Sequence, residues 1–339
     1  PYTTLFRSRP IAMSERILAL MGPTASGKSS LAERLAERFD GELISVDSAL
    51  VYRGLSIGAA KPDYPHHLVH LRDPVDPYTA ADFARDAKRC MEEIIARGRR
   101  PILVGGSMLY FRALIHGLDD IPSIAPAIRT AIENEAREVG WPALHRELAT
   151  VDPASAAQLH PNHSQRICRA LEVYRGTGVL LSAWQRGEAI SQADQFECIA
   201  LCTEPRAALH RRIERRLDGM FAEGLIDEVR ALMARGDYHG DLPAIRAVGY
   251  RQVWAYLQGE FDLPTCREKA LVATRQLAKR QLTWLRSWPD LTWMITDDTG
   301  RLIQVDKTAI EPLKTEKNNE IVAVEPVWAD RIESVMRNF

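Results

Sequence analysis

The stretch ILALMGPTASGKSSLAERL, residues 17–35, passes from an apolar run through a glycine-bounded turn into a helical run. Its central part fits the pattern G-x-x-x-x-G-K-[ST] and consists of Gly22, Pro23, Thr24, Ala25, Ser26, Gly27, Lys28 and Ser29. The glycines let the backbone curl so that successive N–H groups converge on phosphate oxygens, while Lys28 adds a positive charge and the Ser29 hydroxyl is placed to hold Mg²⁺. The stretch therefore predicts a phosphate- or nucleotide-binding loop between a strand and a helix.

The composition predicts a soluble globular protein. Its 339 residues are 46 % hydrophobic and 26 % charged, which is enough for a large core. The net charge is −1, so a surface that binds nucleic acid must be a local basic patch. The five cysteines lack the CxxC spacing of metal sites, and no apolar run is long enough to span a membrane. We therefore expect a cytoplasmic monomer with reduced thiols and no membrane partner.

Short β-rich runs alternate with helical stretches over the first part of the chain. This alternation predicts a parallel sheet with helices on both faces, an α/β fold of the P-loop NTPase type. The predicted helices are 29–39 and 80–97, and the predicted strands are RILALM (16–21), GELISVD (41–47), RPILVGG (100–106) and, further along, QFECIALCT (195–203).

Residues 127–176 contain several helical segments and no convincing strand, which favours an all-helical insertion in the sheet domain. A later helix over 265–288 carries six basic residues and one acid, and its charges either face RNA or only solubilise the helix. The predicted organisation is a leader outside the fold (1–13), the first part of the core (14–122), the insertion (123–196), the second part of the core (197–290) and a peripheral acidic tail (291–339).

Asp47 is the carboxylate best placed for chemistry. It follows the strand ELISV, whereas the strand PILVGG runs into Ser107 with no acid. Because ligands bind at the carboxyl ends of parallel strands, Asp47 belongs near the phosphate loop. Three roles stay open from the residues alone: a ligand of Mg²⁺, a general base, or a turn-capping acid.

Several longer strings carry a more specific signal than the phosphate loop. They are SVDSALVYRGLSIGAAKP (45–62), VGGSMLYFRAL (104–114), HPNHSQRICRALEVYRGTG (160–178), AIRAVGYRQVWAYL (244–257) and ATRQLAKRQLTWLR (273–286). In content and order they resemble the bacterial type of the tRNA dimethylallyltransferases, also called tRNA isopentenyltransferases.

This resemblance implies an activity and its partners. The enzyme would transfer a dimethylallyl group from dimethylallyl diphosphate to the exocyclic N6 amine of adenosine 37, next to the anticodon in tRNA, with Mg²⁺ as cofactor. The phosphate loop would then hold a diphosphate leaving group, and the helical insertion would grip the anticodon stem-loop.

The resemblance also implies roles for individual residues. Asp47 would be the general base. Ser107, where the family usually has threonine, would be a second catalytic residue whose hydroxyl bonds to the adenine or to Asp47, and an ordinary turn residue is the alternative. Arg212, Arg216 and Arg251 would join the phosphate loop in binding diphosphate, although structural ion pairs are an alternative for each. The implied tRNA contacts are Asp47, Ser48, Ala49, Leu50, Ser107, Arg129, Gln165, Arg166, Ile167, Cys168, Arg169, Arg246, Ala247, Val248, Gly249, Tyr250 and Arg251. For the segment QRICR, a solvated helix face is the alternative.

Two other functions are compatible with a phosphate loop. A P-loop kinase of a small molecule would use Asp47 to activate a hydroxyl and would consume ATP. A non-catalytic RNA-binding protein would keep its tRNA affinity after loss of Lys28 or Asp47. Neither alternative accounts for the strings SVDSALVYRG and GGSMLYFRAL.

Overall fold

The computed structural model describes residues 16–118, 121–184, 191–306, 314–317, 320–323 and 327–336. The predicted leader, 1–13, lies outside these residues. The chain divides into two compact units, of which the second spans 116–191 and the first comprises the rest. Both boundaries of the second unit precede those predicted for the insertion. The reason is that the chain leaves the core directly after the helix that ends at Ile115 and returns to it at Gln192. The Gln192 N–H donates a hydrogen bond to the Ile115 carbonyl at 2.7 Å, which joins the two crossing points.

A seven-stranded sheet forms the centre of the first unit, and its strands are parallel except for the last pair. This confirms the predicted α/β fold. In spatial order the strands are β3 (His66–His67), β2 (Gly41–Val46), β4 (Arg100–Gly105), β1 (Ile17–Met21), β5 (Phe196–Thr203), β6 (Thr292–Thr296) and the antiparallel β7 (Leu302–Asp306).

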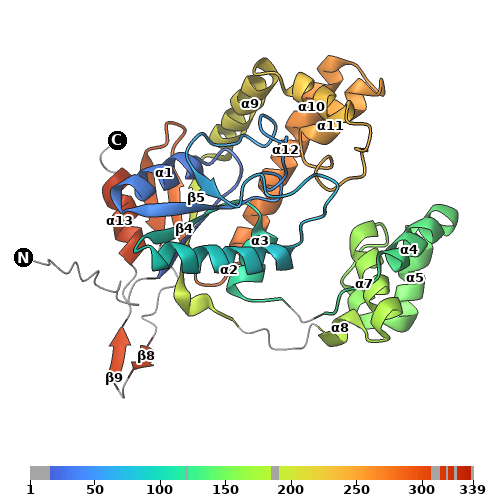
Figure 1. Cartoon of the computed structure of the whole chain (residues 1–339), viewed down its shortest axis with the longest axis horizontal. Helices are drawn as coiled ribbons and strands as arrows, with labels where there is room; N and C mark the ends of the chain where they lie inside the picture. Colours follow the sequence, from blue (N-terminus) through green and yellow to red (C-terminus); the bar gives the residue numbers. More distant parts are fainter. Residues whose placement is uncertain are drawn as a thin grey trace, which may run out of the picture. The chain divides into compact units, whose positions relative to one another are not determined.

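Helices cover both faces of this sheet. Side chains alternate along each strand, and apolar side chains of β1 point to both faces, so each face needs a cover. Leu18 and Leu20 of β1 pack with helices α1 (Lys28–Arg38) and α13 (Val327–Met336), which lie together on one face (Figure 1). Ala19 and Met21 point to the opposite face, into the larger apolar core. The helices that build this core are α2 (Ala80–Ala96), α3 (Met108–Ile115), α10 (Leu225–Met233), α11 (Tyr250–Leu257) and α12 (Leu263–Arg286).

The prediction of a peripheral tail is wrong for β6 and α13 (Val327–Met336). Strand β6 hydrogen-bonds to β5 inside the main sheet, and α13 packs on the same face as α1. The carboxylate of Glu197 in β5 accepts hydrogen bonds from Trp328 N–H at 3.0 Å and Ala329 N–H at 2.8 Å. A buried acid thus satisfies the first amides of α13. The acidic composition of the tail gave no indication of these short elements. Strands β8 (Lys314–Lys317) and β9 (Glu320–Ala323) form a separate hairpin.

The described residues of the second unit form helices joined by short connections, with no strand among them. Its apolar core includes Ile132, Leu144, Leu148 and Leu171, each at most 1 % exposed. The helices are α4 (Pro126–Val139), α5 (Trp141–Val151), α6 (Pro153–Ala157), α7 (Ser164–Thr177) and α8 (Leu181–Trp184).

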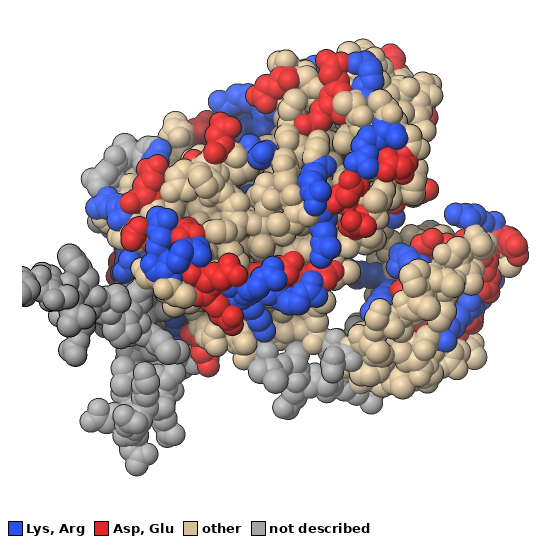
Figure 2. Space-filling view, viewed as in Figure 1, with Lys and Arg blue, Asp and Glu red and all other residues tan. Residues whose placement is uncertain are grey.

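Charges of both signs are interspersed on the visible face of the first unit (Figure 2). This agrees with the near-zero net charge. The basic side chains of α12 lie mainly at the surface, as expected from the sequence. Among the helices of the described ranges, none combines the length and the hydropathy that crossing a membrane requires.

Replacing Trp328 by alanine tests the role of α13. The indole is 1 % exposed and its Nε1–H donates to the Arg16 carbonyl at 2.8 Å. Trp328→Ala should lower the free energy of unfolding by about 3–5 kcal/mol, measured by urea denaturation. Ile303→Ala on β7 removes an apolar side chain that is 57 % exposed and should change it by less than about 0.5 kcal/mol. Equal unfolding midpoints for both variants would exclude α13 from the cooperative core.

Candidate active site

The phosphate loop joins β1 to α1, as predicted. Gly27 precedes the helix with φ 92°, a left-handed conformation that side chains disfavour. It provides no side-chain cap, so the first N–H groups of α1 stay available to an anion. Within the loop, Gly22, Pro23 and Ser26 are buried, Thr24, Ala25, Gly27 and Lys28 are half-buried, and Ser29 is exposed.

Three cationic side chains gather at this loop. Lys28 Nζ donates to the Pro23 carbonyl at 3.1 Å. Desolvation and the charge of Arg216 lower the pKa of Lys28 to about 8, and the charge of Asp47 partly opposes this shift. Arg212 lies over the loop, since a Cβ on Gly27 would be 3.0 Å from its Nη2. Within the described residues, neither Arg212 nor Arg216 has a carboxylate at salt-bridge distance. An anionic ligand would supply the missing counter-charge.

A cavity of about 520 Å³ opens beside these cations. Its cationic lining consists of Lys28, Arg216, Arg246 and Arg280, and the Ser29 hydroxyl lines it as well. Helices α9 (Arg206–Ala222) and α12 supply an apolar wall next to it. The side chains of this wall are Ile213, Leu217, Met220, Leu277 and Trp284. A molecule with an anionic head and a short apolar chain therefore matches the lining.

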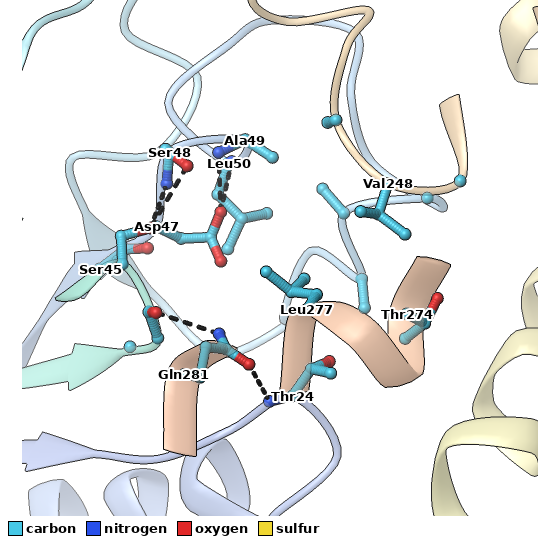
Figure 3. Close-up of a pocket in the computed structure, with 18 of the residues that line it drawn as sticks. Thr24, Ser45, Asp47, Ser48, Ala49, Leu50, Val248, Thr274, Leu277 and Gln281 are labelled. Carbon is cyan, nitrogen blue, oxygen red and sulfur yellow. Dashed lines mark hydrogen bonds between the residues drawn. The ribbon is translucent and has the colours of Figure 1, made fainter. Parts of the chain in front are cut away.

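Asp47 lies at the tip of β2 and borders the same cavity. Its Oδ1 accepts hydrogen bonds from Ala49 N–H at 2.8 Å and Leu50 N–H at 3.2 Å. The turn-capping role that the sequence left open is therefore real, but it uses only one oxygen. The carboxylate points into the space that Leu277 and Val248 border from the other side (Figure 3). The turn thus orients the carboxylate and leaves Oδ2 for a ligand.

The Ser107 hydroxyl contacts Ser48 and makes no hydrogen bond to Asp47. Its Oγ accepts from Ser48 N–H at 2.9 Å and donates to Ser48 Oγ at 3.3 Å. Ser107 therefore joins the end of β4 to the turn after β2, next to the cavity that it lines.

Gln281 was missed by sequence reasoning. Its Oε1 accepts from Thr24 N–H at 2.9 Å, and its Nε2 donates to the Gly106 carbonyl at 3.0 Å (Figure 3). One side chain of α12 thus ties the phosphate loop to the end of β4. The sequence did carry a signal for this role: a polar residue at a buried helical position. Gln281 lies three residues after Ala278 and four before Leu285, on the buried face of the helix.

The structure brings together only some of the predicted site residues of the first unit. Tyr250 is fully buried, so its side chain is removed from contact with tRNA. Arg251 does not line the first cavity but a second one, which shares Val248 and Arg280 with it, so its contact with diphosphate stays a prediction. The predicted tRNA contacts that line the first cavity are Asp47, Ser48, Ala49, Leu50, Ser107, Arg246, Ala247, Val248 and Gly249, and the predicted diphosphate ligands that line it are Thr24, Lys28, Ser29 and Arg216.

In the second unit, the predicted tRNA segment on α7 is divided between surface and core. Gln165 and Arg166 are exposed. Ile167 and Cys168 are at most 1 % exposed and pack in the core of this unit, which corrects their prediction as side-chain contacts.

The two remaining arginines predicted to contact tRNA both meet Glu172. Arg129 lies 3.4 Å and Arg169 3.5 Å from its Oε2. Both therefore have a structural partner inside the unit, and their contact with tRNA stays a prediction.

Comparison with protein families gives a clear match. Residues 50–288 match the family model described as IPP transferase. The tRNA dimethylallyltransferase 2 of Hahella chejuensis is 51 % identical over 302 residues, which cover 83 % of this chain and 91 % of the relative. The tRNA dimethylallyltransferase of Stenotrophomonas maltophilia is 54 % identical over 297 residues, which cover 84 % and 92 %.

Solved structures agree with these matches. The tRNA isopentenylpyrophosphate transferase of Bacillus halodurans shares 39 % identity with a TM-score of 0.61, over 84 % of this chain and 91 % of that one. A eukaryotic dimethylallyltransferase acting on tRNA shares 25 % identity with a TM-score of 0.70, over 84 % and 75 %.

The lowered pKa of Lys28 predicts how anion binding depends on pH. Below about pH 8 the ammonium is charged; above it the proton is lost, so the affinity for pyrophosphate should fall by up to about tenfold per pH unit. Calorimetric titration without metal, from about pH 7 to 9.5, measures this. Lys28→Met should bind more weakly and should lack this part of the slope, so the comparison corrects for ionisation of pyrophosphate itself. Parallel slopes for both proteins would contradict the assignment.

Proposed function

This chain belongs to the IPP transferase family, and on that basis we propose that it modifies tRNA by prenyl transfer. It transfers a dimethylallyl group from dimethylallyl diphosphate to the N6 amine of adenosine 37, beside the anticodon, and releases diphosphate. The names of its relatives support this function over the small-molecule kinase and over a non-catalytic RNA-binding protein.

The observation that carries the proposal is the lining of one cavity. Cations without a carboxylate partner among the described residues, an apolar wall and a half-used carboxylate border the same space. The phosphate loop, Lys28 and Arg216 bind the diphosphate, with Arg212 above the loop. The apolar side chains of α9 and α12 receive the five-carbon chain, and Asp47 faces the acceptor.

The reaction breaks the allylic C1–O bond and forms a C1–N6 bond. The electron pair of the broken bond stays on the diphosphate, where the loop amides and the cations stabilise the growing negative charge. Asp47 Oδ2 takes the proton that N6 loses, which assists a weakly nucleophilic amine. The bonds from Ala49 and Leu50 hold Oδ1, so the carboxylate is oriented before the acceptor arrives.

The chain offers few ligands for the proposed Mg²⁺. Its described residues include no group of three or more His, Cys, Asp or Glu side chains placed around a metal position. The Ser29 hydroxyl lines the cavity and is an oxygen donor of the kind that Mg²⁺ prefers, whereas the free oxygen of Asp47 is kept for the proton of N6. Diphosphate oxygens would complete the site, and the ion would add positive charge on the leaving group.

Adenosine must leave the stacked anticodon loop to reach Asp47. The segments 47–50 and 246–249, which border the cavity, are the proposed contacts of the extruded nucleotide. Gln165 and Arg166, exposed on α7, are the proposed contacts of the second unit with the anticodon stem-loop.

Incubation with labelled dimethylallyl diphosphate, Mg²⁺ and unmodified tRNA tests the proposed function. Label should appear on N6 of the adenosine next to the anticodon, located by nucleoside mass analysis. Splitting of ATP that depends on a small acceptor, with no label in tRNA, would favour the kinase instead.

Two substitutions of Asp47 separate its roles as base and as turn cap. Asp47→Ala removes both, whereas Asp47→Asn keeps an oxygen for Ala49 and Leu50. Both variants should lower single-turnover rates by about 10² or more and leave tRNA affinity nearly unchanged, because each lacks the base. An Asp47→Asn variant as fast as wild type would assign the residue to the turn alone.

A further inference from the structure

The turn at residues 56–60 is organised around a carboxylate from a distant helix. Glu228 of α10 accepts three backbone hydrogen bonds there, through Oε2 from Ser56 N–H at 3.1 Å and Ile57 N–H at 2.8 Å, and through Oε1 from Gly58 N–H at 3.2 Å. Successive N–H groups that converge in this way form an anion-binding nest. The protein fills this nest with its own side chain.

Tyr250 completes the arrangement. Its hydroxyl donates to Glu228 Oε1 at 2.6 Å and accepts from Ala59 N–H at 3.2 Å. Burial and the contact with Glu228 raise the pKa of Tyr250, so the phenol remains a donor. A Cβ on Gly58 would lie 2.7 Å from ring carbons of Tyr250, so only glycine allows this close packing. Glu228 and Tyr250 therefore join the turn to the start of α11.

Both joined segments are walls of the active-site cavity. Gly58, Ala59 and Ala60 line it from one segment, and Arg246 to Gly249, just before Tyr250, line it from the other. Helices α10 and α11, which supply the two side chains, pack against each other (Figure 1). Neither Glu228 nor Tyr250 lines the cavity itself.

We infer that Glu228, acting with Tyr250, is a positioning residue that sets the acceptor side of the prenyl-transfer site by holding residues 56–60 against residues 246–250. The inference rests on the proposed function. A carboxylate suits this task because it offers two oxygens, each accepting two hydrogen bonds here, and because it has no hydrogen to oppose the converging N–H groups.

The diphosphate side is held by other contacts. Lys28 donates to the Pro23 carbonyl, and Gln281 joins Thr24 to Gly106. These hydrogen bonds include neither Glu228 nor Tyr250. Loss of Glu228 should therefore loosen the walls that receive the nucleotide and leave the phosphate loop in place.

Three variants and a matched control test this inference. Glu228→Ala and Glu228→Gln should both lower kcat/KM for tRNA by about 10-fold to 100-fold, since the amide of glutamine turns an NH₂ group toward N–H donors. Tyr250→Phe keeps the ring and the three backbone bonds to Glu228, so its loss should be smaller. Asp227→Asn changes a charge in the same helix on a side chain that is 79 % exposed, and should behave as wild type.

Two measurements that do not depend on catalysis accompany the kinetics. Hydrogen exchange at the amides of 56–58 should accelerate in both Glu228 variants. In Tyr250→Phe, the amide of Ala59 should exchange faster, because it loses its acceptor. The dissociation constant for pyrophosphate should stay within about twofold of wild type in all variants.

Unchanged exchange at 56–58 in the Glu228 variants, or unchanged kcat/KM for tRNA, would overturn the inference. A loss of pyrophosphate affinity that parallels the loss of kcat/KM would also overturn it, because it would indicate general unfolding. Tyr250→Phe, which removes a single oxygen, provides this test even if the Glu228 variants fail to fold. An inactive wild-type protein with the expected exchange pattern would instead contradict the proposed function.

Discussion

Unpaired positive charge at the carboxyl end of the sheet is the constraint on which the site depends. Lys28 and Arg216 face one cavity, Arg212 lies over the same loop, and the described residues provide neither arginine with a carboxylate at salt-bridge distance. Burial, and after it the nearby charge of Arg216, lower the pKa of Lys28, so the free site holds this charge at a cost. An anion bound here would offset the repulsion between these cations, so the arrangement favours an anionic ligand at this position.

The parallel sheet explains why the rest of the chemistry lies within reach of these cations. Strands β1, β2 and β4 are neighbours, and their carboxyl ends supply the phosphate loop, Asp47 and Ser107 to one edge. Helices α9 and α12 close that edge with apolar side chains. One cavity thereby joins a charged end to an apolar wall, as a prenyl diphosphate requires.

Three carboxylates of this protein differ in how many of their oxygens accept structural hydrogen bonds. Glu228 gives both oxygens to the turn at 56–60, and Glu197 gives both to the start of α13, so each holds structure. Asp47 gives one oxygen to its own turn. The contrast supports a chemical role for Asp47, because its second oxygen is left available beside the cations that bind the leaving group.

The sequence by itself determined the α/β class, the phosphate loop, the position of Asp47 at a strand end and the helical insertion, because each depends on spacing along a short stretch of chain. Only the tertiary structure decided that Tyr250, Ile167 and Cys168 are buried, that Arg251 lies at another cavity, and that β6 and α13 belong to the core. The same holds for Gln281 and Glu228, whose partners lie far away in sequence. Burial and long-range hydrogen bonds depend on how distant elements pack, and local periodicity carries little information about that packing.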